Sequence, residues 1–120
     1  SAAREMVAHL VSLGHARIGH IKGHFAHGAS GWRLAGYKDG LGQAGLPYDP
    51  ELVVDGEFSY DSGFAATNRL LGLRRPPTAI FAANDDMAAG AICAICERGL
   101  SVAWYVSVCG FDDAPISRQI

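Results

Sequence analysis

Short apolar runs alternate along this chain with longer stretches in which apolar residues recur every three or four positions. The runs predict four strands, at 17–21, 52–54, 78–82 and 106–110, and the spaced patterns predict four helices, at 2–13, 32–42, 60–71 and 87–97. Strands that alternate with helices in this way are typical of βαβ units. The sequence therefore predicts an α/β fold with a doubly wound parallel sheet covered on both faces.

Several helix ends carry capping signals. Ser59 or Ser62 is expected to cap the third helix, and Asn84 or Asp85 the fourth. The segment 23–31 is expected to be a loop rich in glycine and histidine. The helix after it is expected to keep one apolar face, made of Trp32, Leu34, Ala35, Tyr37 and Leu41.

Polar or aromatic residues follow every predicted strand. In an open parallel sheet, ligands bind in the crevice outside the carboxyl ends of the strands. We therefore expect a single polar rim, formed by His24, His27, Ser30, Arg33, Asp55, Glu57, Phe58, Asn84, Asp85, Asp112 and Asp113.

Two members of this rim carry charge that suits a hydroxylated ligand. The fork of N–H donors on Arg33 fits vicinal hydroxyls or a carboxylate, although the residue taken alone favours a solvated helix arginine. The carboxylates of Asp112 and Asp113 can accept hydrogen bonds from sugar hydroxyls. The same pair can instead form a turn that leads to Pro115.

Two further members have a structural explanation that the sequence alone favours. Asn84 can cap the fourth helix, bind a hydroxylated ligand, or do both. Phe58 can stack on a sugar ring or a base, or it can belong to the core.

Composition narrows the class of protein. Ten Lys and Arg against twelve Asp and Glu give a net charge of −2, so no basic face for nucleic acid is indicated. No apolar stretch of about twenty residues is present to span a membrane. A length of 120 residues fits one domain or part of one. The odd number of cysteines, three, fits a protein of a reducing compartment, and we expect the cytoplasm.

The sequence offers little support for metal binding or catalysis. His20, His24 and His27 do not have a metal-ligand spacing, and Cys93 and Cys96 lie inside an apolar helix, where small buried side chains are the simplest interpretation. No P-loop and no Gly-x-Ser-x-Gly motif occurs. We expect no enzyme, no cofactor and no metal.

Several segments, in order, resemble the effector-binding domain of LacI/GalR-family transcriptional regulators. They are 13–21 (LGHARIGHI), 30–37 (SGWRLAGY), 77–85 (PTAIFAAND), 87–91 (MAAGA), 97–100 (ERGL) and 106–113 (VSVCGFDD). The resemblance implies that 1–120 is a partial effector-binding domain, the C-terminal lobe of a type I periplasmic-binding-protein-like fold. The DNA-binding helix-turn-helix and most of the N-terminal lobe would be absent.

The same resemblance assigns roles to residues. Arg33, Phe58, Asn84 and Asp112 match effector contacts, and Ala29 occupies a position often held by a small hydroxyl residue. Two features depart from the family pattern. The stretch 103–105 replaces a usual Pro-x-Asp, and Cys109 stands where Val or Ile is usual.

The expected function is therefore effector sensing in a transcriptional regulator, with a sugar or related small molecule as the effector. Operator DNA would be bound only through the missing N-terminal domain. A homodimer is expected, formed through the helix 87–97 and the segment 114–120. The alternative is a periplasmic sugar-binding protein of a transporter, which would share the lobe and the rim.

Overall fold

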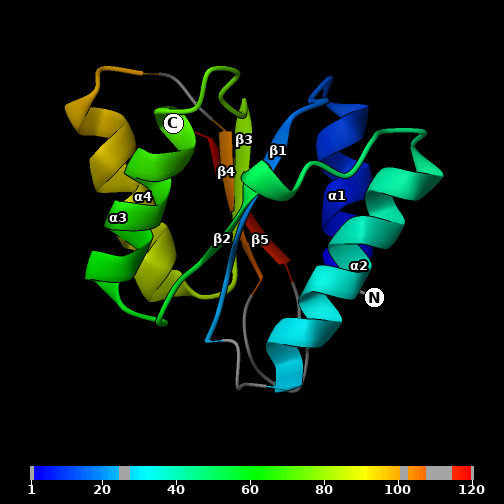
Figure 1. Ribbon diagram of the computed structural model, residues 1–120, viewed down its shortest axis with the longest axis horizontal. Helices are drawn as coiled ribbons and strands as arrows, with labels where there is room; N and C mark the ends of the chain where they lie inside the picture. The colour runs from blue at the N-terminus through cyan, green and yellow to red at the C-terminus, as the bar shows by residue number, and fades with distance from the viewer. Residues whose placement is uncertain (1, 25–27, 101–102, 108–114, 120) are drawn as a thin grey trace.

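The protein folds as a five-stranded sheet between two pairs of helices (Figure 1). The computed structural model describes the backbone of residues 2–24, 28–100, 103–107 and 115–119, and the side chains of 2–24 and 31–100. The elements are α1 (Ala2–Ser12), β1 (Ile18–Lys22), α2 (Gly28–Gln43), a 3-10 turn (Pro50–Leu52), β2 (Val53–Asp55), α3 (Tyr60–Leu71), β3 (Ala79–Ala82), α4 (Asp85–Glu97), β4 (Ala103–Ser107) and β5 (Pro115–Gln119).

The strand order is β2-β1-β3-β4-β5, with the first four strands parallel and β5 antiparallel to β4. Helices α1 and α2 cover one face, and α3 and α4 cover the other (Figure 1). The expected α/β fold with helices on both faces is confirmed. The antiparallel fifth strand was not predicted. It lies at the edge of the sheet and begins at Pro115, and proline is tolerated on edge strands, where its missing N–H breaks no ladder hydrogen bond.

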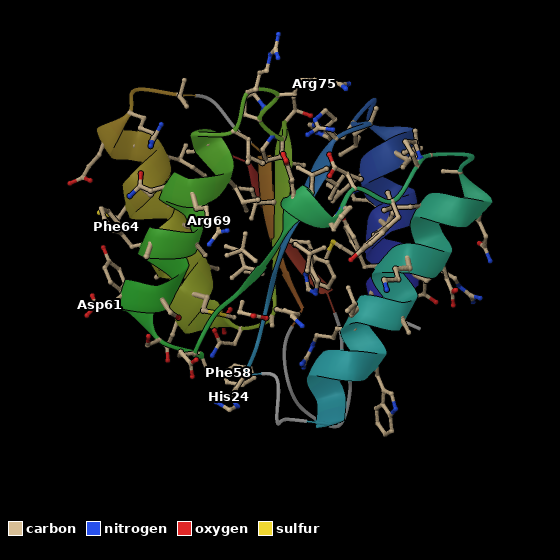
Figure 2. All side chains as sticks on the ribbon, viewed as in Figure 1. His24, Phe58, Asp61, Phe64, Arg69 and Arg75 are labelled. Carbon is tan, nitrogen blue, oxygen red and sulfur yellow. The ribbon has the colours of Figure 1, made fainter. Side chains whose placement is uncertain are left out.

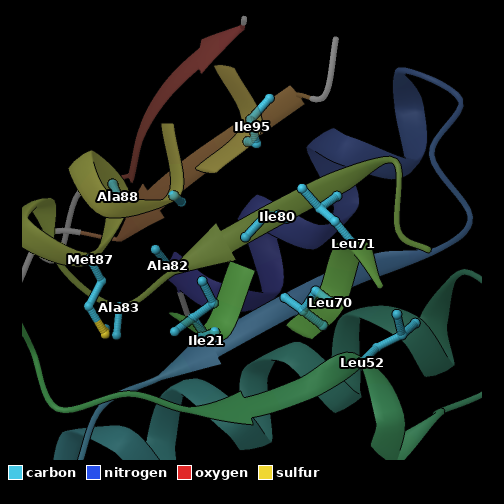
Figure 3. Close-up of a cluster of buried hydrophobic side chains, with 12 residues drawn as sticks. Ile21, Leu52, Leu70, Leu71, Ile80, Ala82, Ala83, Met87, Ala88 and Ile95 are labelled. Atoms are coloured by element: carbon cyan, nitrogen blue, oxygen red, sulfur yellow. The ribbon is translucent and has the colours of Figure 1, made fainter. Parts of the chain in front are cut away.

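Each face of the sheet buries its own apolar cluster. Strand residues alternate between the two, as the pleat requires. Ile21, Ile80 and Ala82 face α3 and α4 (Figure 3), and Ile18, Ala79 and Phe81 face α1 and α2.

Helices α3 and α4 approach closely because each has a glycine at the contact. A Cβ atom added to Gly63 would collide with the backbone of Met87, and one added to Gly90 would collide with the Tyr60 carbonyl. Their starts follow the predicted signals. Ser59, rather than Ser62, caps α3 by accepting from the Ser62 N–H at 3.1 Å in a capping box.

The prediction for the second helix was wrong in its start and in part of its buried face, since Tyr37 and Leu41 are buried as expected. The helix begins at Gly28, inside the expected loop, and its buried residues are Arg33, Gly36, Tyr37, Gly40 and Leu41. Trp32, expected inside, has 81% of its surface exposed. Gly40 explains the choice of face, since a Cβ there would lie 2.7 Å from Val7, so the glycine lets α1 approach.

Strand boundaries also differ from expectation. The 3-10 turn occupies Leu52, so β2 starts at Val53. The stretch 103–105, which departs from the family pattern, belongs to β4. This strand ends at Ser107, and residues 108–110, which were predicted to continue it, lie outside the described residues. The segment 115–119 pairs with β4, with Tyr105 opposite Ser117.

Candidate effector-binding site

The connections of β1 and β3 form a topological switch point at the carboxyl edge of the sheet. These strands are neighbours, but the chain leaves β1 toward β2 through α2 and leaves β3 toward β4 through α4, on the opposite face. Such a switch point separates the two connections and opens a ligand crevice between them. This edge is the lower one in Figure 1, where α2 and α4 begin.

Arg33 lies on the buried side of α2, near this edge. Only 6% of its surface is exposed, so it is not a solvated helix arginine. Its positive charge interacts electrostatically with His20 on β1 and helps to lower the pKa of the imidazole. A guanidinium held inside the fold at a switch point is suited to forming strong hydrogen bonds with a polar ligand.

His20 is wholly buried beneath Arg33 and was not predicted as part of this edge. Its Nδ1 lies 3.0 Å from the Phe81 carbonyl oxygen, and its ring stacks on Phe81 and Tyr37 at centroid distances of 4.5 and 5.3 Å. Burial lowers its pKa to about 4, against the opposing effect of the hydrogen bond to Phe81; the charges of Arg33 and Lys22 lower it further. The imidazole is therefore neutral, and Nδ1 donates to Phe81.

An ion pair and a second polar contact join the ends of β1 and β2. Lys22 Nζ lies 3.2 Å from Asp55 Oδ1, and His24 Nε2 lies 3.6 Å from Glu57 Oε2. Of these residues, His24, Asp55 and Glu57 were expected on the rim, and the structure brings them together. Lys22 was not expected, since it ends an apolar run and no motif marks it.

Phe58 lies at this edge with its backbone at a φ of +61°, in the left-handed region. Its ring occupies the space that a side chain at Gly23 would need, and it packs against the core cluster while remaining partly exposed. Figure 2 shows Phe58 and His24 at the same lower edge. The ring is thus partly in the core, as one of the two interpretations required, and partly exposed at the edge where the other would place a ligand.

Asn84 caps α4 and also fastens the loop that carries Phe58. Its Oδ1 accepts from the Met87 N–H at 2.9 Å, and its Nδ2 donates to the Phe58 carbonyl oxygen at 3.0 Å. Capping is therefore confirmed for Asn84 rather than Asp85. One amide hydrogen and part of the oxygen's acceptor capacity remain for a ligand.

The remaining predicted residues are only partly placed. Ala29 lies in the first turn of α2, at the switch point. His27, Asp112 and Asp113 lie outside the described residues, as does the side chain of Ser30. Their contribution to the crevice stays a prediction.

The interpretation of the cysteines needs correction. Both lie in α4, as expected, but Cys93 is only half-buried and Cys96 is exposed. Among the described side chains, no three His, Cys, Asp or Glu residues gather as a metal site would require. No helix in the described part of the chain has the length and apolar character needed to cross a membrane.

Comparison with known proteins identifies the family. Residues 7–120 match the profile of the periplasmic binding protein-like domain. The chain belongs to this domain family. Among its relatives it is similar to LacI-family transcriptional regulators, which confirms the resemblance described above.

Three relatives show how far the similarity extends. The transcriptional repressor PurR of Actinobacillus pleuropneumoniae is 43% identical over 92% of this chain and 33% of its own length. The probable transcriptional repressor ExuR of Bacillus subtilis is 42% identical over 98% of this chain and 35% of its own length. A sugar-binding LacI-family regulator from Escherichia coli, solved with phosphate, is 35% identical, with a TM-score of 0.81, over 88% of this chain and 38% of its own.

This periplasmic binding protein-like domain thus spans about a third of the length of the curated relatives that it matches. All three relatives are transcriptional regulators, which does not favour the alternative of a transporter's binding protein.

Proposed function

We propose that this domain is the effector-sensing lobe of a LacI-family transcriptional repressor and that its effector is a sugar. The observation that carries the proposal is Arg33, a guanidinium held almost wholly inside the fold at the switch point of the sheet. The sugar-binding regulator from Escherichia coli, with the same fold, supports the choice of ligand class. We propose binding without catalysis, in the cytoplasm.

The chemistry of the edge suits a polyhydroxylated ligand. Arg33 supplies several N–H donors, and the half-buried ring of Phe58 offers an apolar surface for the C–H face of a sugar. Asp112 would supply carboxylate acceptors, and Ala29 would let the ligand approach the start of α2. Asn84 would contribute its remaining amide hydrogen.

In the full-length protein, effector bound at this edge would be enclosed by a second lobe. An effector that prefers the closed form of the two lobes shifts the population toward it. That shift would change affinity for operator DNA, which a separate N-terminal domain would bind.

The experiment is calorimetric titration of the full-length protein with the effector selected from a thermal-shift screen of sugars. Arg33→Ala should lower affinity by about 30- to 1,000-fold, because about 2–4 kcal/mol is typical for loss of a buried charge-assisted hydrogen-bond donor. Arg74→Ala is the matched control, since Arg74 is exposed at the opposite edge. Its affinity should stay within about twofold of the wild type.

The result that contradicts the proposal is equally specific. An Arg33→Ala protein that melts normally and binds the sugar as tightly as the control would remove this edge from effector binding. Asp112→Asn extends the test to the other proposed charged contact and should weaken binding by a similar factor.

We also propose that the full-length protein is a homodimer that pairs through α4 and the segment 114–120. Most of α4 is covered by α3 and the sheet, but Ala89 and Cys96 are exposed, and Ile92 and Cys93 are half-buried. An apolar surface of this kind is typical of an interface. Light scattering should give twice the chain mass, and a monomer at micromolar concentration would contradict the proposal.

A further inference from the structure

A pocket lies at the amino-terminal edge of the sheet, opposite the candidate effector site. Its volume is about 370 Å³, near the lower end of the range for small-molecule sites, which begins at roughly 300 Å³. Three connections build it: α1–β1 contributes Ala16 and Arg17, α2–β2 contributes 46–50 and Leu52, and α3–β3 contributes Arg75.

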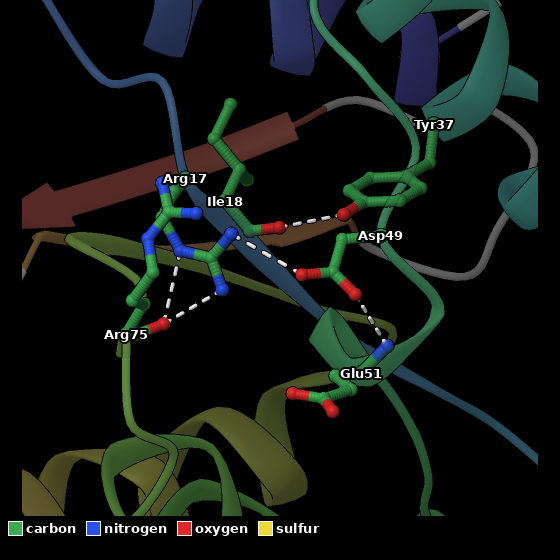
Figure 4. A network of polar contacts seen from close by, with 6 residues as sticks. All are labelled: Arg17, Ile18, Tyr37, Asp49, Glu51 and Arg75. Carbon is green, nitrogen blue, oxygen red and sulfur yellow. Dashed lines mark hydrogen bonds and ion pairs between the residues drawn. The ribbon is translucent and has the colours of Figure 1, made fainter.

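A hydrogen-bonded frame holds these three connections together (Figure 4). Arg17 donates from Nε and Nη2 to the Arg75 carbonyl oxygen at 2.9 and 2.7 Å, and from Nη1 to Asp49 Oδ2 at 3.2 Å. Asp49 also accepts from the Glu51 N–H at 3.0 Å. Because each connection is fixed to another, the pocket is preformed, and a ligand need not order it.

The charges on the wall are unequal. Arg17 and Asp49 form an ion pair and largely neutralise each other. The side chain of Arg75 is exposed at the upper edge in Figure 2, and no carboxylate among the described side chains lies within ion-pair distance of it. Lys38 does not line the pocket, but its Nζ lies 4.6 Å from the centre of the Tyr48 ring, which does.

The rest of the lining is mostly apolar. Leu46, Pro47, Pro50 and Leu52 supply aliphatic surface, and Leu52 is almost fully buried at the base. The ring of Tyr48 is 40% exposed and forms a further wall. The pocket therefore combines an apolar body with the cation of Arg75.

We propose that this pocket binds a small organic carboxylate with an aromatic or short aliphatic body. The body lies against 46–50 and Leu52, and the carboxylate pairs with Arg75. Because this edge is opposite the one that carries Arg33, the carboxylate and the effector bind at the same time. The site does not depend on the identity of the effector.

The test follows 4-fluorobenzoate by fluorine NMR with the full-length protein, and compares it with the neutral 4-fluorobenzamide. The acid should bind more tightly than the amide by about three- to fivefold, as expected for a partly exposed ion pair. Arg75→Gln should remove that preference. Arg74→Gln is the matched control, because Arg74 is an exposed neighbour that does not line the pocket, and it should keep the preference.

Two further arms locate the site. Ala16→Leu, which fills part of the pocket, should abolish binding of 4-fluorobenzoate, whereas Arg33→Ala should leave it unchanged. Equal binding of acid and amide, equal losses in the two arginine variants, or full binding by Ala16→Leu would overturn the proposal. Displacement of the probe by the effector would also overturn it. So would an absence of binding at about 10 mM 4-fluorobenzoate, which means a binding free energy weaker than roughly 3 kcal/mol.

Discussion

Replacing His20 by leucine should make the stability of this domain less sensitive to acid. His20 has no exposed surface, and its ring is enclosed by Phe81 and Tyr37. Burial lowers the pKa of the imidazole from 6.5 to about 4, so the folded protein resists protonation that the unfolded chain accepts readily. Leucine fills a similar volume and does not titrate.

The size of the effect follows from the two pKa values. At pH 7 the imidazole is neutral in both states, and its full contribution to stability is present. As the pH falls below 6.5, the unfolded chain binds a proton, while the folded protein does so only near its own pKa of about 4. The difference of about 2.5 pKa units, at about 1.4 kcal/mol each, corresponds to roughly 3 kcal/mol lost between these two pH values.

The assay is urea unfolding of the wild type and His20→Leu at pH 7 and pH 4, followed by circular dichroism. At pH 7 the variant should be less stable by about 1 kcal/mol, because the buried Phe81 carbonyl loses its donor. At pH 4 it should be the more stable protein by about 2 kcal/mol, the difference between the two effects. Titrations of carboxylates common to both proteins cancel in this comparison.

Trp32→Leu is the control, because Trp32 is 81% exposed on α2 and does not titrate. Its unfolding free energy should differ from that of the wild type by the same amount at both pH values. The reasoning is refuted if the difference between wild type and His20→Leu is the same at pH 7 and pH 4. In that case His20 would be protonated in the folded protein or reachable by water.

Three further substitutions test the packing and the loops. Gly90→Ala should destabilise the domain by about 2–4 kcal/mol in thermal or urea unfolding, because the added Cβ would force α3 away from α4. Gly31→Ala is the control and should not destabilise the domain, because Gly31 has open space around it. Asn84→Ala should lower the free energy of unfolding by about 1–2 kcal/mol. Asn84→Asp should recover part of that loss in the same unfolding experiment, because aspartate keeps the cap but cannot donate to the Phe58 carbonyl. Arg17→Gln should cost about 1 kcal/mol and raise hydrogen exchange in all three connections that it joins, and unchanged exchange there would contradict the structural role of the frame.

Local sequence signals were enough where the physics is local. The Ser59 cap needs only its neighbour Ser62, and the Asn84 cap needs only the Met87 N–H three residues later, so both could be predicted. The start of α2 could not be predicted, because glycine and serine at 28–31 favour a loop in isolation. The body of α2 packs against α1 through Gly40 and Val7, and such contacts between distant segments leave no local trace in the sequence.

The candidate site divides in the same way. Arg33, Phe58 and Asn84 follow successive strands in the sequence, and this order alone predicts that they share one edge, because parallel strands end together. Whether Arg33 is exposed or buried depends on the rotation of α2, which Gly40 and Val7 decide. His20 and Lys22 lie in an apolar run with no motif, so nothing in the sequence assigns them to the site.

The sequence by itself determined the order of the four helices and the four parallel strands, the caps and the edge at which polar side chains gather. These follow from periodicity and capping, which act over a few residues, and from the rule that parallel strands share an edge. Only the tertiary structure decided which face of α2 is buried, that Asn84 fastens the Phe58 loop, and that Arg17 joins three connections into a pocket. Each of those depends on residues tens of positions apart, whose proximity is created by folding and has no counterpart in the local pattern.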